Sequence, residues 1–215
     1  MAGLIITIAQ QKGGAGKTTV AAHLAVAFAM GRKSVAVLDV DPQGSLGQWY
    51  ERREELYGEE DTGLVFRTAS GWGAQREAKS LARSHDIVIL DTPPKSDLEL
   101  KPAIKAASLV VVPVQPTPMD LWATEPTLAM IDREGTPSLL VLNRVVARAL
   151  LTGEVTDAVA KLGHPVANNT FGSRVGYAAA MGVGGTVLEM EPSSLAAQEA
   201  EAVAREVGRR ARREG

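Results

Sequence analysis

Six short apolar runs recur along the chain, with room for a helix between most of them, and this alternation constrains the fold more than any other feature. The runs are rich in Val, Ile and Leu and lie at 4–9, 34–39, 64–68, 86–91, 109–114 and 138–143. Several are apolar almost throughout, as expected for strands covered by helices on both faces. With right-handed crossovers, the pattern predicts an α/β fold: a doubly wound, mostly parallel sheet with helices on both faces.

The length and composition indicate one domain spanning residues 1–215. A chain of 215 residues can bury a sizeable core, and no linker, repeat or low-complexity tract divides it. After residue 143 the pattern turns helical at 149–162, 173–181 and 194–213, with a short extended piece at 166–170. The first run starts almost at Met1 without a signal-peptide pattern, and no apolar run approaches about 20 residues, so we expect a cytoplasmic protein.

The absence of cysteine excludes several chemistries. With no Cys in the chain, disulfides, thiolate zinc sites, iron–sulfur clusters and a cysteine nucleophile cannot occur. An iron–sulfur reductase is therefore ruled out.

Polar and turn-forming residues follow each predicted strand, at the edge of a parallel sheet where ligands bind. The first strand leads into a glycine-rich loop, and the others are followed by Asp39-Val40-Asp41-Pro42, Asp91-Thr92-Pro93-Pro94, Pro113–Pro116 and Asn143-Arg144. Polar residues scattered over a surface would not gather in this way. The sequence therefore predicts one functional edge of the sheet.

The glycine-rich loop has the residue types of a phosphate-binding loop. It reads Lys12-Gly13-Gly14-Ala15-Gly16-Lys17-Thr18, followed by Thr19 and a predicted helix at 19–30, with Gly31 as its C-cap. In such loops backbone N–H groups hold phosphates, the lysine neutralises them, and the hydroxyl binds Mg²⁺. A dinucleotide fingerprint would require a third glycine, which is missing. A glycine-rich turn without a ligand is the alternative.

The loop departs from the general G-x-x-x-x-G-K-[ST] pattern at its beginning. Gln11 stands where the first glycine would be, and a second lysine, Lys12, comes next. One lysine suffices for an ordinary phosphate cradle, so the second one requires an explanation.

Two carboxylates would complete a metal–nucleotide site. Asp91 ends a buried strand and is a candidate to hold Mg²⁺, while Asp41 is a candidate to bind the metal's waters and orient an attacking water. Asp39 is a weaker candidate. Each of the three could instead be a helix N-cap or a turn residue.

Taken together, Lys12, the segment 39–44 and the segment 91–94 give the chain a sequence that resembles the ParA/MinD family of deviant Walker P-loop ATPases. It is most similar to short ParA-type proteins without an N-terminal helix-turn-helix. The resemblance covers nearly the whole chain and weakens at 50–83 and 145–164; the stretches 173–180 and 185–189 resemble the ParA C-terminal region.

The resemblance implies roles for individual residues in an ATP- or ADP-bound, Mg²⁺-dependent ATPase. Lys12 would reach the nucleotide of the opposite subunit in an ATP-bound homodimer, and Lys17 would contact the β- and γ-phosphates. Thr18 would ligate Mg²⁺, Asp41 would position or activate water, and Asp91 would hold a metal-bound water. Asn143 and the 113–118 segment, including Pro116, would contact adenine, although Asn143 could cap a strand end and the prolines could shape a loop.

The resemblance also implies partners. ParA-type proteins bind DNA non-specifically as ATP dimers and leave it when a ParB-like or adaptor protein stimulates hydrolysis, which partitions or positions a plasmid, a chromosome locus or a protein cluster over the nucleoid. The net charge is only −2, but the C-terminus is locally basic, and Arg205, Arg209 and Arg210, with Arg174, are candidate DNA contacts. The alternative is a solvated helix face with ion pairs to Glu201 and Glu206.

Two other functional classes stay open. A MinD-like regulator would attach to a membrane through bulky apolar residues opposite a basic helix face, and the C-terminal segment offers mainly Ala and Val, so we expect no stable membrane association. A metabolic P-loop enzyme would transfer phosphate to a small acceptor. A tyrosine kinase is disfavoured because only Tyr50, Tyr57 and Tyr177 occur.

Overall fold

The computed structural model describes residues 2–94, 97–146 and 154–214. Its centre is one parallel six-stranded sheet with the order β3-β2-β4-β1-β5-β6. The strands are β1 (Leu4–Ile8), β2 (Val35–Asp39), β3 (Val65–Thr68), β4 (Ile87–Asp91), β5 (Leu109–Val114) and β6 (Ser138–Leu142). The predicted doubly wound α/β fold is confirmed.

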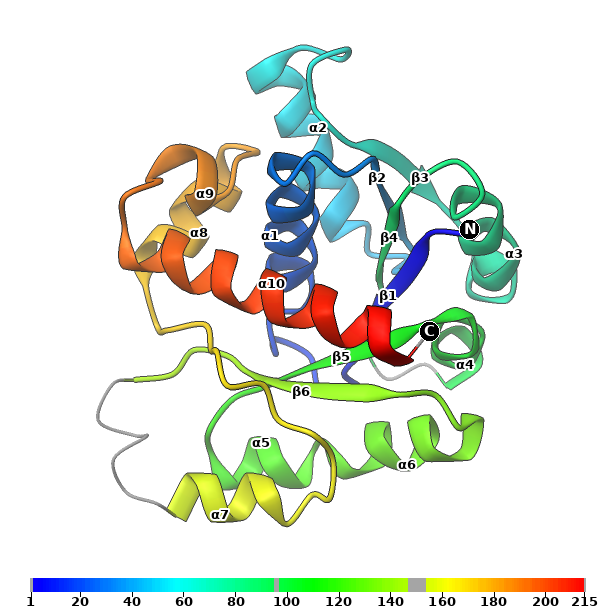
Figure 1. The fold of residues 1–215 in the computed structure, drawn as a ribbon, viewed down its shortest axis with the longest axis vertical. Coiled ribbons are helices and arrows are strands. Elements are labelled where there is room, and N and C mark those ends of the chain that lie inside the picture. Colours follow the sequence, from blue (N-terminus) through cyan, green and yellow to red (C-terminus); the bar gives the residue numbers. More distant parts are fainter. Residues whose placement is uncertain (1, 95–96, 147–153, 215) are drawn as a thin grey trace.

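Helices cover both faces of this sheet (Figure 1). One face carries α1 (Lys17–Met30), α2 (Ser45–Tyr57), α8 (Val175–Gly182), α9 (Val187–Met190) and α10 (Leu195–Glu214). The other carries α3 (Ala74–Leu81), α4 (Asp97–Ala106), α5 (Pro118–Trp122), α6 (Glu125–Glu134) and α7 (Glu154–Ala160), with a 3₁₀ turn at Gly71–Gly73 before α3. Figure 1 shows α10 crossing α1, and the two helices are in contact.

The strands supply apolar side chains to both layers, as their continuous apolar runs require. In β1, Ile6 and Ile8 pack under α1 and α10, while Ile5 packs on the opposite face. In β2, Val37 and Leu38 divide in the same way. All five residues are buried. Because successive side chains alternate across a strand, a fully apolar run is stable only when both faces are covered.

The predicted limits of the strands and of two C-terminal helices agree closely with the structure, because each follows from a local pattern of apolar residues. Every strand begins and ends within one residue of its predicted limits, and the segments at 173–181 and 194–213 correspond to α8 and α10. The helix expected at 19–30 starts two residues earlier, at Lys17, because the phosphate loop runs directly into it. The predicted helix at 149–162 lies partly outside the described residues, and α7 occupies its second half. The extended piece at 166–170 contributes one isolated bridge, between Leu140 and Val166.

Candidate functional site

The phosphate loop connects β1 to α1 at the carboxyl edge of the sheet. Gly14 and Gly16 have φ angles of +76° and +90°, a region where a Cβ is strongly disfavoured, so glycine is required for this path. The loop borders a cleft of about 630 Å³. Residues lining the cleft include Gly13, Gly14, Gly16, Lys17, Thr18, Thr19, Asp41, Gln48, Arg52 and Arg144. The predicted loop residues and Asp41 thus meet at one cleft, with the N-terminus of α1 facing it.

Two side chains that follow the neighbouring strands β5 and β6 donate hydrogen bonds to backbone carbonyls of the phosphate loop. Asn143 Nδ2 donates to the C=O of Ala15 at 2.8 Å, and Gln115 Nε2 donates to the C=O of Gly14 at 3.1 Å. Asn143 Oδ1 accepts from the N–H of Arg144 at 2.9 Å. Asn143 was predicted to contact adenine; here it is buried and bonded to the loop, and adenine contact stays a prediction. Pro116 is half-buried next to Gln115, ahead of α5.

Thr18 and Asp91 lie together, as a metal site would require. The Thr18 hydroxyl donates to Asp91 Oδ2 at 2.6 Å, and Asp91 Oδ1 is buried without a hydrogen-bond partner. Burial raises the pKa of Asp91 to about 7, with the Thr18 hydroxyl bond acting in the opposite direction. A buried carboxylate oxygen without a partner beside a hydroxyl fits Mg²⁺ held through its water shell, since Mg²⁺ prefers oxygen ligands and keeps several waters.

Lys17 is the cation of the cleft. Its side chain is buried, and burial lowers its pKa, while the charges of Asp91 and Asp41 act to raise it. A buried ammonium group in this position gains from an anionic ligand, because phosphate oxygens would replace the water that it has lost.

The carboxylates after β2 divide between structural and cleft-facing roles. Asp39 is buried, accepts the N–H of Asp41 at 3.0 Å and the N–H of Gly47 at 3.0 Å, and burial raises its pKa. Asp39 therefore holds the turn, which is the alternative considered above. Asp41 is half-exposed, borders the cleft, and accepts the N–H of Gln43 at 2.9 Å.

Lys12 lies apart from the other loop lysine. Its Nζ contacts Asp120 Oδ1 of α5 at 2.5 Å, and it does not belong to the lining of the cleft that holds Lys17. The sequence does not single out Asp120 or Gln10, whose Oε1 accepts the N–H of Lys12 at 3.3 Å. No local pattern marks these residues, because their partners are brought to them by the fold.

The four predicted DNA-binding arginines lie on the surface of α10 and just before α8, and three are paired within the chain. Arg174 bonds Glu199 at 2.5 Å, Arg205 bonds Glu201 at 2.8 Å, and Arg210 bonds Glu214 at 3.0 Å. Arg209 is exposed. The Arg205 pair is exposed and therefore weak, so it leaves that guanidinium group able to contact phosphate, whereas the pairs of Arg174 and Arg210 are half-buried.

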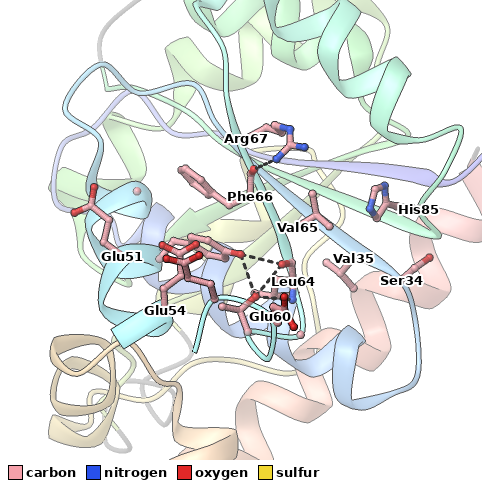
Figure 2. Close-up of a pocket in the computed structure, with 15 residues that line it drawn as sticks. Ser34, Val35, Glu51, Glu54, Glu60, Leu64, Val65, Phe66, Arg67 and His85 are labelled. Atoms are coloured by element: carbon pink, nitrogen blue, oxygen red, sulfur yellow. Dashed lines mark hydrogen bonds between the residues drawn. The ribbon is translucent and has the colours of Figure 1, made fainter. Parts of the chain in front are cut away.

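A second hollow, of about 780 Å³, lies at the β3 edge and is unsuited to phosphate (Figure 2). Its lining includes four glutamates, Glu51, Glu54, Glu59 and Glu60. Their charge would repel a nucleotide, and the phosphate loop is not part of the lining. The cleft at the loop is therefore the candidate site.

Comparison with known proteins agrees with this geometry. Residues 6–206 match the CobQ/CobB/MinD/ParA nucleotide binding domain. The chain is 33% identical to the chromosome-partitioning ATPase Soj of Thermus thermophilus, over 94% of each chain. It is 29% identical to maintenance of carboxysome distribution protein A of Halothiobacillus neapolitanus, over 86% of this chain and 87% of that one.

Solved structures with a similar fold include a MinD protein. The septum site-determining protein MinD of Pyrococcus horikoshii, solved with Mg-ADP, superposes with a TM-score of 0.81 and 20% identity, covering 99% of this chain and 98% of that one. The family match, the Soj relative and the phosphate loop agree. The chain belongs to the ParA/MinD family of deviant Walker P-loop ATPases.

Proposed function

We propose that the chain hydrolyses ATP, with Mg²⁺, in the cleft at the phosphate loop. Lys17 would neutralise the β- and γ-phosphates, Thr18 and Asp91 would hold the metal and its water, and Asp41 would position the attacking water. The 2.6 Å contact between Thr18 and Asp91 supports this assignment, as does Mg-ADP bound to the MinD of Pyrococcus horikoshii.

We also propose that ATP drives formation of a homodimer, and the position of Lys12 supports this. Lys12 Nζ is held on α5, away from the lining of its own cleft. A lysine that does not serve its own nucleotide is available to contact the nucleotide of a second copy. The two nucleotides would then lie between the subunits, and hydrolysis would separate them.

We assign the ATP dimer to non-specific DNA binding on the nucleoid, within the cytoplasm. Exposed arginines on α10 support this assignment, and the apolar face of that helix, including Ala200, Val203 and Val207, is buried against α1 and the sheet. No described helix is long and apolar enough to cross a membrane. A ParB-like or adaptor protein would stimulate hydrolysis and release the protein from DNA, and the cargo would be a plasmid, a chromosome locus or a protein cluster.

The test of the dimer compares Lys12→Ala with Lys101→Ala. Lys101 is an exposed lysine paired with Glu134 at 3.1 Å, so it controls for the loss of one surface charge. Light scattering should show a dimer with Mg-ATP for the wild type and for Lys101→Ala, and a monomer for Lys12→Ala, with turnover reduced in parallel. A wild type that stays monomeric with Mg-ATP contradicts the proposal.

The test of DNA binding measures retention on arbitrary duplex DNA at increasing salt. We expect retention with Mg-ATP and not with Mg-ADP, weakening steeply as salt rises because counterions are released from the phosphates. Arg209→Glu should lower the affinity of the dimer for DNA without changing dimerisation. Equal retention in both nucleotide states would contradict the proposed switch.

A further inference from the structure

The contact between Lys12 and Asp120 joins the phosphate loop to α5. Lys12 Nζ lies 2.5 Å from Asp120 Oδ1, and the two side chains are 35% and 8% exposed. The residues are 108 positions apart in sequence. An ion pair between a half-exposed lysine and a buried carboxylate is stronger than one on the surface, because water screens it less.

Asp120 is the fixed end of this pair. The Thr117 hydroxyl donates to its Oδ2, and its own N–H donates to Thr117 Oγ1 at 3.2 Å, which caps the start of α5. Its C=O accepts from the Thr124 hydroxyl at 2.8 Å. Any change that separates the two charges must therefore move Lys12, whose side chain is long and has four rotatable bonds.

The loop backbone is tied to the same helix region through Gln10. Gln10 Nε2 donates to Thr124 Oγ1 at 2.9 Å, while its Oε1 accepts the N–H of Lys12 at 3.3 Å and the Thr127 hydroxyl at 3.1 Å. These bonds hold the Lys12 backbone in place beside α5. Only the side chain of Lys12 is then free to change partner.

Reaching the nucleotide of another subunit would draw the Lys12 ammonium group away from Asp120 and break this ion pair. When it leaves, the carboxylate of Asp120 stays buried without its cation, with only the Thr117 hydroxyl to compensate. Removing one partner from a buried charge pair is costly, so this step opposes dimerisation. ATP must supply enough new contacts to exceed that cost.

We propose that Asp120 is a positioning residue that holds Lys12 within its own subunit and thereby sets the nucleotide threshold for dimerisation. This inference rests on the proposed function, since it concerns how the ATP dimer forms. Asp120 acts through Lys12, and the device keeps the ADP-bound chain monomeric.

The test uses Asp120→Asn, which keeps the shape of the side chain and an oxygen to accept from Thr117 but removes the charge. Sedimentation should show the Mg-ATP dimer of this variant to be about tenfold tighter than that of the wild type, and some dimer should form with Mg-ADP. Asp132→Asn is the control: Asp132 is an aspartate of α6 that is 66% exposed and contacts His164. It should match the wild type.

A second measurement reports on the monomer alone. Acetylation of Lys12 in the ADP-bound protein, followed by mass spectrometry, should be several times faster in Asp120→Asn than in the wild type or in Asp132→Asn, whereas labelling of Lys101 should not change. Lys101 is 61% exposed, so its labelling controls for the activity of the reagent, and equal urea midpoints for the three proteins exclude a general loss of stability.

The outcomes separate this proposal from the one it depends on. A wild type that never dimerises with Mg-ATP overturns the proposed function. A wild type that dimerises normally, with Asp120→Asn showing the same dissociation constant and the same Lys12 labelling, overturns the role of Asp120 alone.

Discussion

Asn143 Nδ2 donates to the C=O of Ala15 at 2.8 Å, and the same nitrogen lies where a Cβ on Gly16 would come within 2.3 Å of it. The end of β6 therefore both supports the phosphate loop and limits what can stand in it. Gly16 has a φ of +90°, so the backbone and the neighbour both require glycine.

We expect Gly16→Ala to abolish nucleotide binding and to destabilise the fold by more than the roughly 1–2 kcal/mol of a left-handed alanine, because Asn143 must also move. Isothermal titration with ATP and urea unfolding would measure the two effects. Gly135→Ala is the matched control, because Gly135 also has a positive φ, +65°, but nothing lies within 4 Å of its Cβ. Equal losses in the two variants would show that the Asn143 contact has no effect.

The buried carboxyl of Asp91 should make stability fall as pH rises. Its folded pKa of about 7 lies above the value of about 3.9 for an unfolded chain. Between these values the folded state binds the extra proton, so raising the pH removes stability, and above pH 7 the loss is complete. Asp91→Asn lacks this term and should gain about 2.6 kcal/mol on the wild type between pH 5 and pH 8 in urea unfolding without Mg²⁺.

Asp91→Asn should weaken binding of Mg-nucleotide, although it raises stability in the absence of Mg²⁺. Because the ionised carboxylate would hold the metal through a bound water, affinity of the wild type for Mg-nucleotide should rise as pH increases through 7, and Asp91→Asn should bind Mg-nucleotide weakly at every pH. Asp157→Asn, an exposed aspartate of α7, should follow the wild type in both measurements. A stability difference that does not change with pH would contradict the assignment.

His23 should give a pH dependence of the opposite sign. It is fully buried, its Nδ1–H donates to the C=O of Thr19 at 2.7 Å, and its Nε2 accepts the N–H of Val187 at 3.2 Å. Burial lowers its pKa to about 4, below the unfolded value of about 6.5. The unfolded state therefore binds more protons between pH 6.5 and 4, and stability is lost as the pH falls through that range.

His23→Leu should remove this acid dependence while costing about 1–3 kcal/mol at pH 7, because the N–H of Val187 loses its acceptor. Urea unfolding at pH 7 and pH 4.5 would measure both terms. His85→Leu, at a partly exposed histidine, should keep the wild-type slope. A His23→Leu variant with an unchanged slope would disprove the assignment.

Removing one partner of the ion pair between Arg53 and Glu189 should strongly destabilise the face that carries α2 and α9. Arg53 is buried, bonds Glu189 at 2.6 and 3.1 Å, and donates to the C=O of Thr62 at 2.8 Å. Arg53→Ala should cost about 3 kcal/mol of unfolding free energy, since Glu189 is left largely buried. Arg205→Ala breaks an exposed pair and should cost below about 1 kcal/mol in the same urea titration. Similar costs for both variants would contradict this ranking.

The strands could be predicted almost to the residue because each is a local apolar run, and parallel strands covered on both faces leave that pattern in the sequence itself. The order β3-β2-β4-β1-β5-β6 could not be predicted, since periodicity within a run carries no information on which runs pair. The four-residue helix α9 was also missed, because its stability comes from the capping box of Thr186 and Glu189 and from burial under α1.

Part of the candidate site could likewise be predicted from the sequence, and part could not. The residue types from Lys12 to Thr18, their place after a strand, and the aspartates after β2 and β4 were enough to predict a Mg²⁺–nucleotide site and the family. The contacts of Asn143 and Asp120 could not be predicted, because the backbone group and the charge that they bind lie on other elements, whereas the turn role of Asp39 depends on nearby residues and was one of the alternatives predicted.

The sequence by itself determined the chemistry that this protein can offer: glycines for a phosphate loop, two lysines, a hydroxyl and the carboxylates at one edge of a parallel sheet. Tertiary structure decided how those groups are used. Burial sets the proton affinity of Asp91, and α5 brings Asp120 to Lys12 across 108 positions of chain. Solvation and charge depend on distant residues, so only the folded chain shows that one lysine faces its own cleft while the other is held away from it.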